Sequence, residues 1–162
     1  MIDSMYFITA VGERMDWNTD PDPNGYFAVE ELQFEPEARS NSRNRMQAQG
    51  AWPSYTYFGH MLIHINGHIL AVDSAHYNAY KLRLMRIIMP IDLSYQAQRH
   101  VGQFGVRFTG QSEDFITEVG LDAAPSISNE ALFPSVSPIQ LTLKSFFPYM
   151  IGVATGRAYW VA

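Results

Sequence analysis

The chain has 162 residues, 47% of them hydrophobic and 14% aromatic, and its formal net charge is −5. These values predict a single folded domain over residues 1–162 with a core of its own, and they exclude an intrinsically disordered chain. The negative charge argues against a nucleic-acid-binding protein, which normally presents a basic stripe. The chain contains no cysteine, which excludes disulfides, thiolate metal sites and cysteine nucleophiles. It also has no run of about 18 apolar residues, so no membrane span is predicted.

Two strands and one long polar segment are predicted in the first third of the chain. Residues 6–11 predict a strand, residues 12–25 are rich in Asp, Asn and Pro and predict a loop, and residues 26–34 alternate as a second strand. One face of that second strand is expected to carry Tyr26, Ala28, Leu32 and Phe34, with Glu30 interrupting it. Residues 35–53 are polar. Because so long a loop is uncommon in a compact domain, we expect an extended arm or loop with a role of its own.

The stretch from residue 55 to residue 90 organises the rest of the chain. Residues 55–65 are apolar and aromatic, Asn66-Gly67 follows, and residues 68–72 are apolar again. Asn-Gly favours the two positive φ angles that a tight turn between antiparallel strands requires. The sequence therefore predicts a β-hairpin with its turn at Asn66-Gly67.

A helix is predicted over about residues 74–89. Asp73 or Ser74 can cap it, because a short side-chain oxygen accepts hydrogen bonds from the free N–H groups of the first turn. Pro90 ends it, since proline cannot continue a helix. The buried face is expected at the three-to-four spacing of Tyr77, Tyr80 or Lys81, Leu84 and Ile88. Three cations fall in the later turns, where they suit the helix dipole: Lys81, Arg83 and Arg86.

The C-terminal half is predicted to be strands joined by loops. Further strands are expected at residues 101–108, 115–121, 139–147, 149–154 and 158–161, with a loop over 122–135. The strands alternate in polarity, which is typical of antiparallel sheets with one solvated face. The predicted fold class is mainly β (α+β): an antiparallel β-sandwich or split barrel flanked by one helix.

The sharpest match to a chemical motif is a calcium-loop spacing. Asp20, Asp22, Asn24 and Gly25, with Glu31 six residues later, follow the pattern D-x-D-x-N-G-x5-E. Oxygen ligands two residues apart can converge on one hard cation. The helices that normally flank such a loop are not predicted here, however, so the context favours a surface turn built on Asp and Pro.

Histidines at a spacing of four form the next pattern. On the predicted hairpin, His60 and His64 lie roughly 13 Å apart along an extended strand, too far to share a metal, and His68 falls on the opposite face from His64. We therefore expect these residues to be strand histidines at a surface or an interface. His76, in the first helical turn, and His100, before a strand, have no recognisable partner.

Templates for catalysis are missing from the sequence. It contains no nucleophile elbow, phosphate loop, dinucleotide fingerprint or H-E-x-x-H motif. Four carboxylates form a run along the sequence: Glu30, Glu31, Glu35 and Glu37. A solvated rim explains this run as well as the paired carboxylates of a glycosidase would, because the sequence does not give the distance between them. The sequence thus predicts no enzyme, no catalytic, cofactor-binding or metal-binding residue and no cofactor.

The order of four segments resembles a known family. The polar segment ends in Q-A-Q-G-A-W (residues 47–52). L-I-H-I-N-G-H-I-L-A-V-D (62–73) and the helix Y-N-A-Y-K-L-R-L-M-R-I-I-M-P (77–90) follow. A strand with Gly102 and Val106 comes next, and L-T-L-K-S-F-F-P-Y (141–149) closes the series. Over about residues 28–150 this order resembles the ring-forming domain of distal tail proteins and related minor tail proteins of long-tailed bacteriophages. Their closing motif is Asp-Pro-Tyr, and here phenylalanine replaces the aspartate.

This resemblance implies a structural virion protein. Such domains form a ring, usually a homohexamer, that joins the end of the tail tube to the tail tip or baseplate hub, with DNA only passing through the lumen. It implies assembly in the host cytoplasm and location in the phage tail. Acidic side chains lining the bore would let DNA slide past, because Lys and Arg contacts hold phosphate. The alternative is a β-sandwich carbohydrate-binding module, with or without calcium at Asp20–Glu31.

Overall fold

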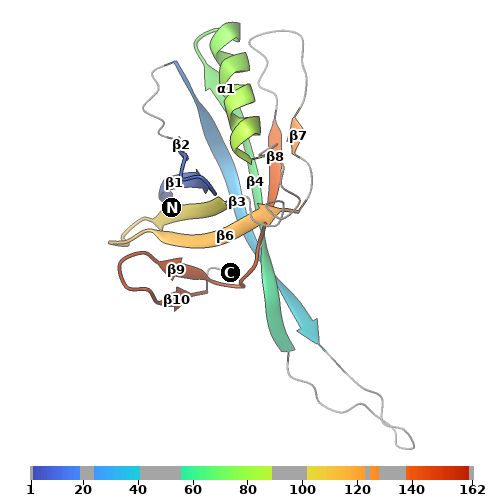
Figure 1. Cartoon of the computed structure of the whole chain (residues 1–162), viewed down its shortest axis with the longest axis vertical. Helices are drawn as coiled ribbons and strands as arrows, with labels where there is room; N and C mark the ends of the chain where they lie inside the picture. Colours follow the sequence, from blue (N-terminus) through green and yellow to red (C-terminus); the bar gives the residue numbers. More distant parts are fainter. Residues whose placement is uncertain are drawn as a thin grey trace, which may run out of the picture.

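Ten antiparallel strands and one helix form the part of the chain that this computed structural model describes, which is residues 2–18, 24–40, 56–88, 102–122, 125–127 and 138–160 (Figure 1). The predicted fold class, mainly β with one flanking helix, is confirmed. Seven strands follow one another across a curved sheet in the order β2-β1-β5-β6-β8-β4-β3. The sheet is open, since no ladder joins β2 to β3.

The strands differ greatly in length. Two of them, β3 (Gly25–Ser40) and β4 (Thr56–Ala71), have 16 residues each and cross the whole height of the molecule (Figure 1). The other strands of the sheet path are β1 (Ile2–Thr9), β2 (Arg14–Trp17), β5 (Gly102–Phe108), β6 (Phe115–Leu121) and β8 (Ile139–Ser145). Three short strands lie beside it: β7 (Ser126–Ile127), β9 (Met150–Gly152) and β10 (Ala158–Tyr159).

The helix α1 (Ser74–Ile88) confirms the sequence prediction. Asp73 is the cap: its Oδ1 accepts a hydrogen bond from the His76 N–H at 2.8 Å. That bond, together with the contact to the His76 ring, holds the pKa of Asp73 below its ordinary value. The helix buries Tyr80, Leu84, Ile87 and Ile88 in the same apolar cluster as the inward side chains of β3 and β4. No helix of the described residues is long and apolar enough to cross a membrane.

The predicted hairpin turn at Asn66-Gly67 is wrong. β4 continues through both residues as a straight strand and is paired on each side, since Gly67 lies opposite Val29 of β3 and Ile139 of β8. These two ladders supply more hydrogen bonds than a local turn could, so tertiary pairing overrides the Asn-Gly preference. Glycine serves another purpose here, because a Cβ at position 67 would lie 2.3 Å from the Ala28 carbonyl oxygen.

A β-bulge explains why Glu30 interrupts the alternation of β3. The register with β4 shifts between Val29 and Glu31, which leaves Glu30 as an extra residue. The predicted grouping of Tyr26 and Ala28 with Leu32 and Phe34 is therefore wrong. The side chains that pack on the core are instead Phe27 and Val29 before the bulge and Leu32 and Phe34 after it.

Two segments predicted as loops contain strands. β2 lies inside the predicted loop 12–25, and its Trp17 is fully buried against Phe7 and Phe27. β7 lies inside the predicted loop 122–135. The predicted arm 35–53 is a strand as far as Ser40, and its residues 41–53 lie outside the described part of the chain.

The two ends of the strand path meet at Asn18, which directly follows β2. The Asn18 N–H donates to the Phe27 carbonyl oxygen at 2.8 Å, and its side-chain Oδ1 accepts from the Val29 N–H at 2.6 Å. Its φ of 66° lies in the left-handed region, which asparagine tolerates better than most residues. One residue thus joins β2 to β3 where no ladder does.

We expect Asn18 substitutions to rank by how many of these features they keep. Asn18→Ala loses the acceptor and strains the backbone, so it should lower the free energy of unfolding by about 2 kcal/mol. Asn18→Gly relieves the strain and should cost about 1 kcal/mol, while Asn18→Asp keeps the acceptor and should cost less. Urea unfolding followed by tryptophan fluorescence measures the order. Equal losses for alanine and glycine would contradict the backbone account.

Candidate interaction surface

Three histidines of β4 each face a glutamate of β3. His64 Nε2 lies 3.1 Å from Glu35 Oε2, and His68 Nδ1 lies 3.1 Å from Glu30 Oε1. The His60 ring contacts the Glu37 carboxylate in the same way. Because β4 runs straight, residues four apart point to the same face, so the prediction that His68 opposes His64 is wrong.

These pairs belong to a continuous polar face that covers three strands. Glu31 Oε2 accepts a hydrogen bond from the Asn66 amide at 2.8 Å, and the Thr142 hydroxyl of β8 lies 3.4 Å from His64 Nδ1. Lys144, on the same face of β8, lies 3.8 Å from Asp122. We call this surface the acidic face and define it by its four carboxylates and the side chains that touch them: Glu30, Glu31, Glu35, Glu37, His60, His64, Asn66 and His68.

The charged side chains of the acidic face pair one to one and do not converge on a point. No three His, Asp or Glu side chains of the described residues gather at a point where a metal ion could be held. Each histidine meets one carboxylate, and neighbouring histidines are roughly 13 Å apart along the strand. Of the calcium-loop residues, Gly25 opens β3 and Glu31 bonds Asn66, while Asp20 and Asp22 lie outside the described residues.

The acidic face continues onto a projecting ribbon. β8 pairs with β4 only from Met61 to Gly67, whereas β3 pairs with β4 along its full length. Within the described part of the chain, Thr56–His60 therefore has β3 as its one partner strand. Figure 1 shows these ends of β3 and β4 extending beyond the other strands as a two-stranded ribbon. We call this part, Glu37–Ser40 with Thr56–His60, the β-ribbon.

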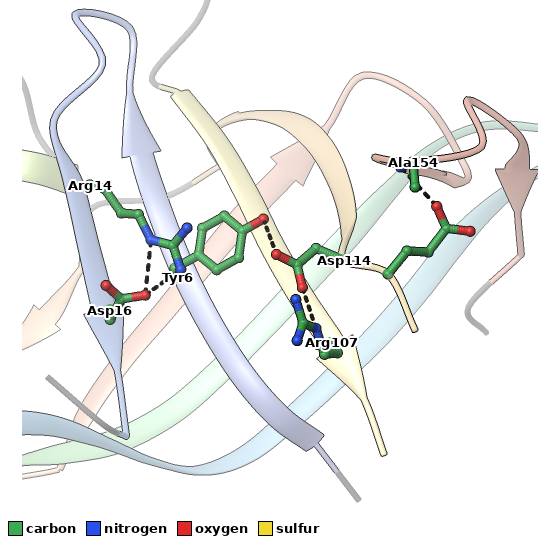
Figure 2. A network of polar contacts seen from close by, with 7 residues as sticks. Tyr6, Arg14, Asp16, Arg107, Asp114 and Ala154 are labelled. Atoms are coloured by element: carbon green, nitrogen blue, oxygen red, sulfur yellow. Dashed lines mark hydrogen bonds and ion pairs between the residues drawn. The ribbon is translucent and has the colours of Figure 1, made fainter. Parts of the chain in front are cut away.

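A second polar network lies at the opposite end of the strand order from β3 and β4, on β1, β2 and β5 (Figure 2). The Tyr6 hydroxyl donates to Asp114 Oδ2 at 3.1 Å, and Arg107 Nε donates to Asp114 Oδ1 at 2.6 Å. The Arg14 guanidinium stacks 3.9 Å from the centre of the Tyr6 ring and also bonds Asp16 at 2.7 Å. Arg14 thus links a cation–π contact to an ion pair.

The surroundings of Tyr6 change its ionisation. Burial of the ring, the charge of Asp114 and the hydrogen bond to Asp114 raise the pKa of Tyr6 to about 12. Gly105 of β5 makes room for the ring, because a Cβ there would lie 2.3 Å from Tyr6 Cε2. The neutral phenol fixed against Asp114 is a structural linkage between β1 and the turn after β5.

A neighbouring carboxylate organises the turn between β9 and β10. Glu113 accepts hydrogen bonds from the N–H groups of Ala154 and Thr155 at 2.9 and 3.0 Å, and from the Thr155 hydroxyl. Desolvation works to raise the pKa of Glu113, but these hydrogen bonds outweigh it and the net shift is downward. The carboxylate is thus held ionised as part of the turn.

A shallow pocket of about 220 Å³ lies beside β6 and β9. The closing motif Phe147-Pro148-Tyr149 supplies its aromatic wall, since the two rings stack at 5.5 Å. Two cross-strand pairs also line it, Ile116 with Ile151 and Gln103 with Glu118. The pocket therefore joins an apolar surface to two polar side chains.

The sequence pointed to some of these residues without showing their partners. The spacing of the residues does indicate the His–Glu contacts. The histidines are four apart and Glu35 and Glu37 are two apart, so each set shares one face if its segment is a continuous strand. The Tyr6–Asp114 contact joins residues 108 positions apart and has no local signal. His76 contacts Asp73 as part of the helix cap, and His100 lies outside the described residues.

The sequence matches no model of a known protein family and no curated protein.

We expect Tyr6→Phe to change the alkaline pH dependence of stability. The pKa of Tyr6 is about 12 in the folded chain and 10.0 for an unperturbed tyrosine, so unfolding releases a proton between these pH values. Stability that is present below pH 10 is lost as the pH rises toward 12, and Tyr6→Phe should lose less over this window. Chemical unfolding at several pH values, with Tyr26→Phe as control, measures the difference. Parallel curves for Tyr6→Phe and the unmodified chain would contradict it.

Proposed function

We propose that this chain is a structural subunit that assembles with copies of itself into a ring. We further propose that this ring, a homohexamer, is the adaptor between the tail tube of a long-tailed bacteriophage and its tail tip or baseplate. In this role the chain performs no chemistry. Its partners are other copies of itself, the tube protein and the hub proteins, and DNA passes through the lumen.

The observation that carries the proposal is the β-ribbon. Exposed strand edges pair readily with another chain, and a long unprotected edge is unfavourable for a protein that works as a monomer. In the described part of the chain, the β-ribbon extends such edges well past the sheet (Figure 1). A ring of identical subunits is one arrangement that satisfies them, because head-to-tail contacts close by rotational symmetry.

The segment order and the fold class support the same role. The resemblance to distal tail proteins implies a β-sandwich or split barrel with one flanking helix, and the chain has a mainly antiparallel sheet with α1 on one side. Binding through faces and edges also agrees with the chemistry of the acidic face, whose described side chains pair with one another across β3 and β4.

Assembly is tested by light scattering after size exclusion, with negative-stain images of the same peak and of formaldehyde-cross-linked protein. We expect closed rings with a central hole and six subunits. Cross-linking retains rings that dissociate on dilution, so it covers the case of weak assembly. A monomer by scattering that also yields no cross-linked species above background would contradict the proposal.

A carbohydrate-binding module is the second candidate, and the pocket at Phe147 and Tyr149 favours it. Stacked aromatic rings next to an amide and a carboxylate suit a ligand with apolar ring faces and hydroxyl groups. Chelator separates the calcium-dependent form of this candidate from the ring. A ligand that binds the folded state stabilises it, so removing calcium should lower the melting temperature of a calcium-dependent module. We expect no change in the melting temperature.

A further inference from the structure

Buried hydrogen bonds hold the aromatic wall of the pocket beside β6 and β9 in place. Ser145, at the end of β8, is fully buried, and its hydroxyl donates to the Phe147 carbonyl oxygen at 2.7 Å. The same Oγ accepts from the Phe147 N–H at 3.2 Å and from the hydroxyl of the buried Thr117 at 2.5 Å. The Phe146 N–H also donates to the Glu118 carbonyl oxygen of β6 at 3.3 Å. The backbone that carries the Phe147 ring is therefore fixed against β6 before any ligand binds.

The apolar side chains of this pocket remain in contact with water. Phe147 is 41% exposed, and its ring stacks on that of Tyr149 at 5.5 Å. Ile151 of β9 is 38% exposed and lies opposite Ile116 of β6. Apolar side chains that stay exposed next to one another are typical of a surface that a partner covers.

Two polar side chains of the pocket are available to a ligand. Gln103 of β5 and Glu118 of β6 lie opposite each other, and both line the pocket. Within the described residues, neither the Gln103 amide nor the Glu118 carboxylate has a hydrogen-bond or ion-pair partner. The volume of about 220 Å³ is below the roughly 300–1,000 Å³ of pockets for drug-sized ligands, so the pocket is sized for a single side chain.

Another part of the same sheet shows which side chain such a surface can hold. The Arg14 guanidinium lies 3.9 Å from the centre of the Tyr6 ring and bonds Asp16. Tyr6 and Ile116 lie in one row across the sheet, on either side of Gly105, so the two sites share a face. The pocket offers the same two groups, an aromatic ring and a carboxylate, to a cation from outside the chain.

We propose that this pocket binds an arginine side chain that a partner protein presents. Arginine stacks its planar guanidinium on aromatic faces, pairs with carboxylates and lays its apolar stem along apolar side chains. Ile116 and Glu118 are two residues apart on β6, about 7 Å, so the stem can cover the isoleucines while the guanidinium reaches the carboxylate. A neutral sugar could not form this ion pair, so the charge of Glu118 favours arginine.

Titration of the full-length chain with short peptides tests the proposal. Isoleucine methyl groups are labelled for NMR, because Ile116 and Ile151 report from the pocket while Ile63 and Ile65 report from the core. A capped glycine–arginine–glycine peptide at millimolar concentration should shift the pocket signals and leave the core signals unchanged. The matching citrulline peptide, which has the same shape without the charge, should bind more weakly by on the order of tenfold.

Variants separate the contribution of the carboxylate from that of the ring. Glu118→Gln keeps the size of the side chain and should weaken the arginine peptide by on the order of tenfold, to the level of the citrulline peptide. Glu31→Gln removes the same charge from the acidic face and should leave binding unchanged. Phe147→Leu keeps an apolar side chain without an aromatic face and should weaken binding about threefold. Circular dichroism checks that each variant is folded.

The outcomes separate a charged ligand from a neutral one. A preference for arginine over citrulline that Glu118→Gln removes would support the proposal. Equal binding of the two peptides, an equal loss in Glu31→Gln, or pocket signals that do not shift at tens of millimolar peptide would overturn it. Pocket signals that shift with methyl glycosides and not with the arginine peptide would also overturn it, in favour of the carbohydrate-binding candidate. Ring closure is independent of these results, because light scattering and cross-linking measure it separately.

Discussion

The fold depends on β4 being hydrogen-bonded along both of its edges. Between Met61 and Gly67 the strand pairs with β3 on one side and with β8 on the other, so each of its residues has a fixed face. Odd-numbered side chains enter the core, and even-numbered ones, among them His64 and Asn66, lie on the side of the acidic face. A slip of one residue would bury His64 and expose Ile63, which makes the register strongly specified. This register also determines the position of α1. The apolar side of the helix packs on the face of β4 that carries Ile63 and Ile65.

Much of the architecture could be predicted from local patterns. The helix over Ser74–Ile88 has a cap and an apolar period, and α1 agrees with both. β6 has the bounds predicted for it, and β8 also follows its predicted alternation, since Leu141 and Leu143 are buried while Lys144 is not. These elements were predictable because their local preference and their tertiary environment agree.

The errors lie where tertiary pairing changes the meaning of a local signal. Asn66-Gly67 has the strongest turn signal in the chain, yet it lies in the middle of a sheet, where glycine lets the Ala28 carbonyl approach closely. At Glu30 a bulge reverses the alternation of β3, which no propensity scale detects. Trp17 was assigned to a loop because a four-residue strand carries too short a pattern to recognise. The His–Glu contacts of the acidic face were not predictable for the same reason, because they form only when β4 continues as a strand through Asn66-Gly67.

The same straight strand determines which side chains share a face of the sheet. A hairpin at Asn66-Gly67 would have placed His68 and His64 on different faces and would have split the acidic surface. The continuous strand instead aligns the carboxylates of β3 over one face and leaves α1 on the other. An isologous dimer built on the acidic face would bring that face against itself, with four glutamates from each copy. Repulsion between like charges disfavours that particular pairing, so a ring that uses the acidic face would bring it against a different surface of the next subunit.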